Sequence, residues 1–188
     1  RMKSNIISYE VFGHELDQLI ELVKDHNSTL ILTTSPINLE KKPKSCSNSD
    51  TWTIQKEIDS INKLVKSGKL KNALIKSRKL TENVVSNAEV LYQYATILKV
   101  IGKYSEAKKN FLMAKAFDCD RDSSNPVYNS IIYKKSQESD IDLVDFQKLI
   151  YNDFIEGTLF LDSLYPQNIY YQKFVIQLSK SIKAILKL

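Results

Sequence analysis

Apolar residues recur at helical spacing near the start of the chain, and a short β-branched run follows them. In residues 15–25 the apolar positions fall on one side beneath a polar face, which predicts an amphipathic helix built on Leu16, Leu19, Ile20 and Val23. Residues 29–34 read Thr-Leu-Ile-Leu-Thr-Thr and stop at Ser35-Pro36, as a buried strand does. A helix followed closely by an apolar strand is the second half of a βαβ unit and implies a parallel sheet.

The same order of elements returns in the last third of the chain. Residues 126–139 have a helical pattern, and residues 141–145 are a short strand. Residues 146–154 are expected to form a short helix or turn, and a closing amphipathic helix runs from about 168 to 186. The polar residues 38–50 indicate a loop.

Between these two parts, one pattern occurs twice at an offset of 34 residues. The matching groups are Gly68-Lys69-Leu70 with Ala73, and Gly102-Lys103-Tyr104 with Ala107. This spacing predicts two helix-turn-helix repeats over residues 54–87 and 88–121. Gly102 suits the tight turn inside the second repeat, where a Cβ would resist the backbone conformation. The first repeat is the more divergent, because Ser77 stands where a large apolar residue is usual and Leu80 where a small one is.

Residues 88–118 resemble a tetratricopeptide repeat at nearly every signature position. The resemblance implies that the first helix of each repeat lines a groove that binds an extended or helical peptide. The residues expected in that groove are Gln55, Ile58, Asp59, Asn62, Glu89, Tyr92, Gln93, Thr96 and Lys99. Tyr92 and Lys99 are the expected anchors for a protein or peptide partner. The alternative is that the chain's own α/β part, or another subunit, fills the groove.

The predicted fold is predominantly α with a minor α/β part, in which the helical repeats are inserted in a partial flavodoxin-like parallel sheet. Its parts are residues 1–50 as the first α/β portion and linker, 51–122 as the helical insertion, and 123–188 as the portion that completes the α/β domain. Two repeats fall short of the three that usually make a stable solenoid, so this pair needs support from the rest. The alternative fold is an all-α helical repeat without a sheet.

Composition and charge narrow the classes of function. The 188 residues are 43% hydrophobic with only four Gly and four Pro, as expected for a folded, mainly helical protein. The net charge is +5, and residues 54–80 hold eight basic side chains against two acidic ones, whereas residues 138–162 hold seven acidic side chains against Lys148. The lysines lack interleaved exposed aromatics and a nucleic-acid module, so a nucleic-acid partner is the less favoured hypothesis.

Several other classes of site lack a signature in the sequence. No apolar stretch is long enough to span a membrane and no export signal precedes the first helix, so we expect a soluble protein of the cytoplasm or of a bacterial envelope. Cys46 and Cys119 lack CxxC spacing and histidine companions, and we interpret them as ordinary buried or loop cysteines. We expect neither a metal site nor a cofactor. His14 and His26 are interpreted as structural or surface residues.

The order of the segments resembles the carboxy-terminal half of SGNH (GDSL-type) hydrolases, in a bacterial subgroup with inserted tetratricopeptide repeats. The matching pieces are LILTTSPINL at 30–39, the repeat pair, NPVYNSII at 125–132, IDLVD at 141–145 and LFLDSLYPQNIYYQKF at 159–174. The last piece is similar to the family's DxxHP block, whose Asp and His complete a Ser-His-Asp triad. The resemblance places Asp162 at the triad Asp, with Tyr165 where the family has His.

Tyr165 changes what this resemblance implies about chemistry. A phenol with a reference pKa near 10 is a poor general base at neutral pH, whereas imidazole titrates near 6.5. The family's nucleophile and oxyanion-hole blocks are absent from the chain. We therefore expect a pseudoenzyme whose repeats act as an interaction or scaffold module, and Asp162 is interpreted as a loop or helix-entry carboxylate. The alternative function is an ester hydrolase that deacylates carbohydrate or lipid, with its nucleophile and base outside these residues.

Overall fold

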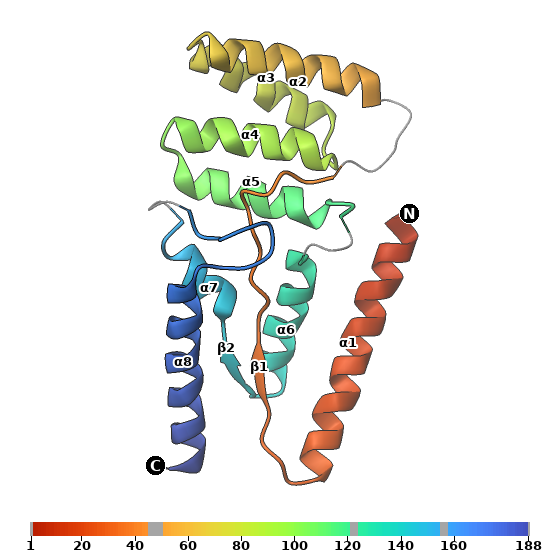
Figure 1. The fold of residues 1–188 in the computed structure, drawn as a ribbon. Coiled ribbons are helices and arrows are strands. Elements are labelled where there is room, and N and C mark those ends of the chain that lie inside the picture. The colour runs from red at the N-terminus through yellow and green to blue at the C-terminus, as the bar shows by residue number, and fades with distance from the viewer. Residues whose placement is uncertain (1, 45–50, 121–123, 155–157, 188) are drawn as a thin grey trace. The chain divides into compact units, whose positions relative to one another are not determined.

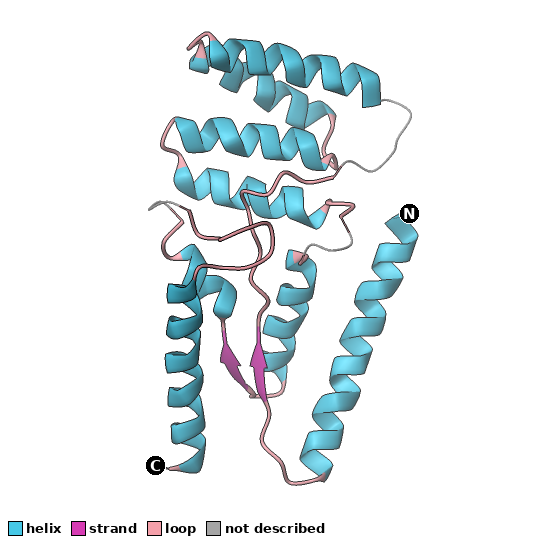
Figure 2. Cartoon of the chain, viewed as in Figure 1, coloured by secondary structure: helices cyan, strands magenta, loops and turns pink. Residues whose placement is uncertain are grey.

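The computed structural model describes residues 2–44, 51–120, 124–154 and 158–187, with the backbone alone at 2–6 and 51. Eight helices and two short strands lie within these residues (Figures 1 and 2). The chain divides into two compact units, of which the α/β unit comprises Arg1–Asn38 with Ser124–Leu188 and the helical unit comprises Leu39–Ser123. The chain is therefore mainly helical with a minor α/β part, as predicted.

The α/β unit contains a small parallel sheet. Its elements are α1 (Met2–Asp25), β1 (Ile31–Thr33), α6 (Pro126–Glu138), β2 (Asp142–Val144), α7 (Phe146–Tyr151) and α8 (Asn168–Leu186). Strand β1 pairs with β2 in parallel, with Ile31 opposite Asp142 and Thr33 opposite Val144. The prediction of two neighbouring parallel strands is thus confirmed, and the all-α alternative is wrong.

The core of the α/β unit joins the first helix to the sheet. Leu16 and Ile20 of α1 are buried with Leu32 of β1. The partly buried residues packed against this cluster are Phe12, Leu30, Ile132, Ile141 and Leu143, so α6 and β2 share the same core. Helix α1 begins well before the predicted residue 15. The apolar Ile7 and Val11 in that extension are 59% and 49% exposed, and hence form no buried stripe that periodicity would detect.

The helical unit consists of two hairpins, α2 (Thr51–Lys66) with α3 (Leu70–Asn83), and α4 (Ala88–Val100) with α5 (Tyr104–Ala116) (Figure 1). Both hairpins turn in the same way. Gly68 and Gly102 have φ angles of +73° and +81°, which an L side chain resists. In each turn the next residue's N–H bonds back to a helix carbonyl: Lys69 to Leu64 at 2.9 Å, and Lys103 to Leu98 at 2.8 Å. These glycine turns match the conformation predicted for Gly102.

The cores of the two hairpins differ at one equivalent position. Phe111 of α5 is buried at 2% exposure, whereas Ser77 of α3, 34 residues earlier, is buried at 1%. The Ser77 hydroxyl has no hydrogen-bond partner. A buried hydroxyl without a partner costs free energy, so the divergence seen in the first repeat places a polar defect in its core.

Candidate functional site

The residues expected to line a groove occupy different environments in the helical unit. On α2, Gln55 donates to Asp59 at 2.9 Å within an exposed turn of helix. Ile58 is only 6% exposed and thus belongs to the core rather than to an open face. The Gln93 amide of α4 donates to the Asn62 amide oxygen of α2 at 2.8 Å, which joins the two helices.

On α4, the expected groove residues share one face of the helix. This α4 face consists of Glu89, Tyr92, Gln93, Thr96 and Lys99. The Asn87 side chain caps the helix by accepting hydrogen bonds from the N–H groups of Glu89 and Val90 at 3.0 and 3.1 Å. The Thr96 hydroxyl donates to the Tyr92 carbonyl at 2.9 Å, so it is engaged within the helix.

An irregular stretch of the same unit, residues 39–44, which bends at 39–41, lies on the α4 face, and we call it the strap. Tyr92 donates its hydroxyl to the Glu40 carbonyl at 2.6 Å. Lys99 pairs with the Glu40 carboxylate at 2.5 Å, and Lys42 pairs with Glu89 at 2.9 Å. The two residues expected to anchor a partner are therefore engaged by the chain itself.

Tyr92 acts in this contact as a neutral donor. Burial, with a smaller contribution from the nearby Glu40 carboxylate, raises the pKa of the Tyr92 phenol above its usual value. Its ring meets Phe111 edge to face, with the ring centres 5.2 Å apart. The hydroxyl is thus held protonated and oriented by the core beneath it.

The far end of the strap joins a cluster of charged residues at the end of α5, which we call the anchor cluster. Its members are Lys41, Lys44, Lys115, Asp118 and Asp120. Lys115 pairs with Asp118 at 2.9 Å, and both side chains are 2% exposed. Asp118 also accepts from the Lys44 backbone N–H at 2.8 Å, while Asp120 pairs with the Lys41 and Lys44 ammonium groups at 2.7 and 2.8 Å.

The anchor cluster keeps buried charges satisfied. Burial lowers the pKa of the Lys115 ammonium, and the hydrogen bond with Asp118 opposes this shift. Asp118 has three donors, since the Asp120 N–H also reaches it at 2.9 Å. Removing either partner of such a pair leaves an uncompensated buried charge, so the cluster fastens the start of the helical unit to its end.

Neither the strap nor the anchor cluster was predicted from the sequence, although the sequence contains one signal of them. Residues 41–44 read Lys-Lys-Pro-Lys and residues 118–120 read Asp-Cys-Asp, so opposite charges flank the helical hairpins on either side. Polar composition alone favoured a loop for residues 38–50. The interpretation of Cys119 as an ordinary thiol is wrong, because it is disulfide-bonded. Cys46, the other cysteine of the sequence, lies outside the described residues.

In the α/β unit, Asp162 and Tyr165 lie in one tight turn. The Asp162 carboxylate accepts from the N–H groups of Leu164 and Tyr165 at 2.7 and 2.8 Å, and these bonds lower its pKa. The Tyr165 side chain is 60% exposed. Asp162 therefore has a local structural role in this turn, as its interpretation as a loop carboxylate expects.

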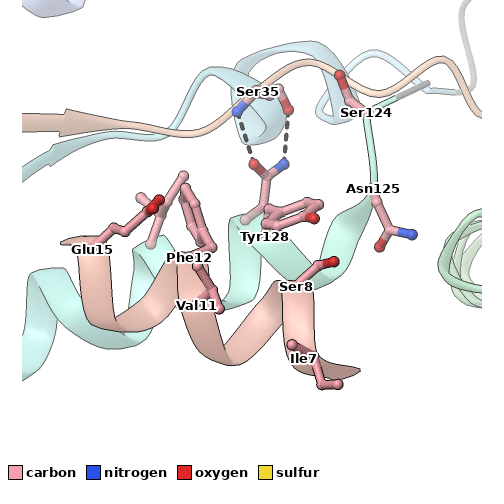
Figure 3. A pocket seen from close by; sticks show the side chains of 11 residues that line it. Ile7, Ser8, Val11, Phe12, Glu15, Ser35, Ser124, Asn125 and Tyr128 are labelled. Atoms are coloured by element: carbon pink, nitrogen blue, oxygen red, sulfur yellow. Dashed lines mark hydrogen bonds between the residues drawn. The ribbon is translucent and has the colours of Figure 1, made fainter. Parts of the chain in front are cut away.

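The α/β unit also contains an open cavity of about 640 Å³ between α1 and α6 (Figure 3). At the polar edge of this cavity, the Asn129 side chain bonds to the backbone of Ser35. Its amide oxygen accepts from the Ser35 N–H at 2.8 Å, and its amide nitrogen donates to the Ser35 carbonyl at 2.7 Å. Phe12 and Tyr128 meet edge to face, with ring centres 5.0 Å apart. The volume suits a small molecule, and the lining combines four apolar side chains with Tyr128, three serines, two asparagines and one carboxylate, Glu15.

The described part of the chain contains no group of three or more His, Cys, Asp or Glu side chains placed to hold a metal ion. None of its helices is both long and apolar enough to cross a membrane.

The chain matches no protein-family model, no curated protein and no solved structure. The case for a function therefore rests on the geometry of the α4 face and the strap.

Proposed function

We propose that the helical unit is a protein-interaction module of the tetratricopeptide-repeat type, which binds an extended peptide along α4 and α2. The observation that carries this proposal is the strap, a non-helical segment that the α4 face already holds by its Glu89, Tyr92 and Lys99 side chains. In this proposal the α/β unit, similar to part of an SGNH hydrolase, supports the module.

The chemistry of the α4 face suits recognition of an extended chain. Tyr92 supplies a neutral donor for a backbone carbonyl, while Lys99 and Glu89 supply charges of opposite sign. A few such anchors provide most of the binding energy at peptide-recognition surfaces. Exposed Asp59 and half-buried Gln55 extend the surface onto α2.

The geometry gives less support to the alternative of ester hydrolysis. The Asp162 carboxylate accepts hydrogen bonds from the backbone of its own turn, and Tyr165 stands at the position where the family has its general-base His. A general base must titrate near the working pH, which a phenol does not do.

The proposal is tested by selecting binders from a random peptide library on the full chain. The affinities of selected peptides are then measured by fluorescence anisotropy on four proteins: the natural chain, Asp59→Ala, Lys99→Ala and the control Lys109→Ala. Lys109 is an exposed lysine of α5 outside the proposed surface. We expect Asp59→Ala or Lys99→Ala to weaken binding about tenfold, the effect of losing roughly 1.4 kcal/mol. Failure to select any peptide, or peptides equally indifferent to all three substitutions, would overturn the proposal.

A further inference from the structure

Helix α1 has an exposed face that is both apolar and acidic. Its exposed apolar side chains include Ile7, Val11 and Leu22, which are between 49% and 59% exposed. Their spacing of four and eleven residues places them on one side of the helix, as a stripe that runs along its outer face. The acidic side chains within or beside this stripe are exposed and have no partner among the described residues: Glu10, Glu15, Glu21 and Asp25.

Helix α8 has an exposed face of the opposite charge. Its apolar stripe, between 37% and 60% exposed, consists of Tyr171, Val175, Ile182 and Leu186. The spacing of four and eleven residues recurs here in Tyr171, Val175 and Leu186. The sequence of this helix contains no acidic residue. Three lysines at its C-terminal end are exposed and have no partner among the described residues: Lys180, Lys183 and Lys187.

From these two faces we infer that α8 of one copy of this chain packs against α1 of a second copy. The contact buries both apolar stripes, each about 22 Å long over four turns of helix. It also joins the unpaired lysines of α8 to the unpaired carboxylates of α1. Exposed apolar stripes rimmed by polar groups mark interaction surfaces. The inference concerns the α/β unit alone and is independent of the proposed function of the helical unit.

Charge determines which helices pair. Two α1 helices facing each other would bring unpaired carboxylates together, and two α8 helices would bring unpaired lysines together. Like charges across a contact oppose association, whereas complementary charges favour it. Lys24 is the only lysine or arginine among the described side chains of α1, so the charge of this helix is mainly negative. The complementary pair is therefore α1 with α8.

A second copy of the chain accounts for both faces, which a lipid surface does not. A basic helix with an apolar stripe suits an anionic bilayer. The same bilayer would repel the carboxylates of α1, so the α1 stripe would stay exposed. Since every copy presents both stripes, association between copies covers α1 and α8 with one kind of contact.

The contact joins copies head to tail. In the α/β unit, α1 and α8 lie on either side of the two strands (Figure 1). A contact between two different surfaces is heterologous, so each added copy offers a new α1 or α8 face until a ring closes. The mass of the assembly should therefore rise with concentration and exceed the mass of a dimer.

The experiment reverses the charge of each face separately in the full chain and measures mass by analytical ultracentrifugation at low salt. The α1 variant carries Glu10→Lys, Glu15→Lys and Glu21→Lys, and the α8 variant carries Lys180→Glu, Lys183→Glu and Lys187→Glu. The natural chain should associate from its monomer mass of 21.6 kDa as concentration rises, and less so at high salt. Each variant alone should associate at least about tenfold more weakly. An equimolar mixture of the two should regain the association, because each reversed face meets its complement in the other variant.

Matched substitutions separate the two faces from net charge and from folding. The control with Lys63→Glu, Lys71→Glu and Lys79→Glu makes the same change in net charge on exposed lysines of the helical unit. It should associate as the natural chain does. If circular dichroism shows that a charge variant is unfolded, Val175→Gln replaces it, with Ile75→Gln at an equally exposed position of α3 as its control. Only Val175→Gln should weaken association, by about tenfold.

The inference is overturned by a natural chain that stays monomeric at every concentration, or by folded variants whose mixture stays monomeric. It is also overturned if a control loses as much association as its matched variant. Binding of a monomeric natural chain to phosphatidylserine vesicles, lost in the α8 variant, would assign α8 to a lipid surface and overturn it as well. Peptide selection on the α4 face tests the proposed function separately, so the failure of either leaves the other intact.

Discussion

The two helical hairpins have turns of the same geometry, but they differ in the residues that they bury and in the contacts that their outer faces make. The glycine turns after α2 and α4 have nearly the same φ and the same backward hydrogen bonds. Below the turns, Phe111 fills the core of the second hairpin, while its counterpart Ser77 leaves a hydroxyl without a partner. A shared turn geometry therefore does not make two hairpins equally well packed.

The outer faces of the hairpins differ as well. The strap contacts Glu89, Tyr92 and Lys99, whose counterparts 34 residues earlier are Gln55, Ile58 and Val65. None of these counterparts has the same charge or hydroxyl. The side chains that hold the strap are thus specific to α4, and the equivalent positions on α2 carry residues of a different kind.

The largest expected effect comes from removing the aromatic core of the second hairpin. Phe111→Ala should lower the free energy of unfolding by about 3–5 kcal/mol, because it empties a buried site and removes the ring that supports Tyr92. Urea unfolding measures this change. The control Met113→Ala, at a 37% exposed position on the same helix, should stay within about 0.5 kcal/mol. Similar losses for the two variants would contradict the assignment of the core.

The next effect concerns the anchor cluster, which the first hairpin lacks. Lys115→Met keeps the volume but leaves the Asp118 carboxylate without its buried cation, so stability should fall by about 3 kcal/mol. The double variant Lys115→Met with Asp118→Asn removes both charges and keeps an amide oxygen to accept from the Lys44 and Asp120 N–H groups. It should recover part of the loss if the pair acts as a unit, and strictly additive losses would argue against that coupling.

A smaller loss of stability is expected from removing the Tyr92 hydroxyl, which its counterpart Ile58 in the first hairpin lacks. Tyr92→Phe should cost about 1 kcal/mol, because it removes the hydroxyl that holds the Glu40 carbonyl and leaves the ring in place. Tyr94→Phe, in the same helix, provides the matched control in thermal unfolding. An equal change in both variants would mean that the strap contact adds no specific stability.

The smallest effect repairs the defect in the first hairpin. Ser77→Ala removes a buried hydroxyl without a partner and should raise stability by about 0.5 kcal/mol. The change brings the first hairpin closer to the second, so urea midpoints should shift upward with an unchanged slope. A loss of stability would show that the hydroxyl has a favourable contact.

Local sequence signals predicted most of the elements. Helical spacing indicated the hairpins, Gly102 indicated its turn, and β-branched runs indicated the two strands that pair in parallel. The same signals missed the true start of α1, since Ile7 and Val11 remain exposed. They also placed Ile58 in a groove although it is buried, because a helical period predicts which residues share a face but not what covers that face.

The candidate site was predictable only as a set of residues. Periodicity placed Glu89, Tyr92 and Lys99 together on one helix, as the structure does. What engages them is residues 40–42, some fifty positions away in the sequence. Their contacts depend on a path of the chain that no local pattern encodes.

The sequence by itself determined the helical hairpins, their glycine turns and the two short strands, because these follow from local backbone preference and from periodic burial. Only the tertiary structure decided that Lys41 and Lys44 neutralise Asp120, that Glu40 occupies the α4 face, and that Asp162 serves its own turn. The physical reason is that the role of a charged group or a hydroxyl depends on the group it contacts. That contact is set by how distant segments of the chain pack together, whereas a turn or an amphipathic helix is set by its own residues.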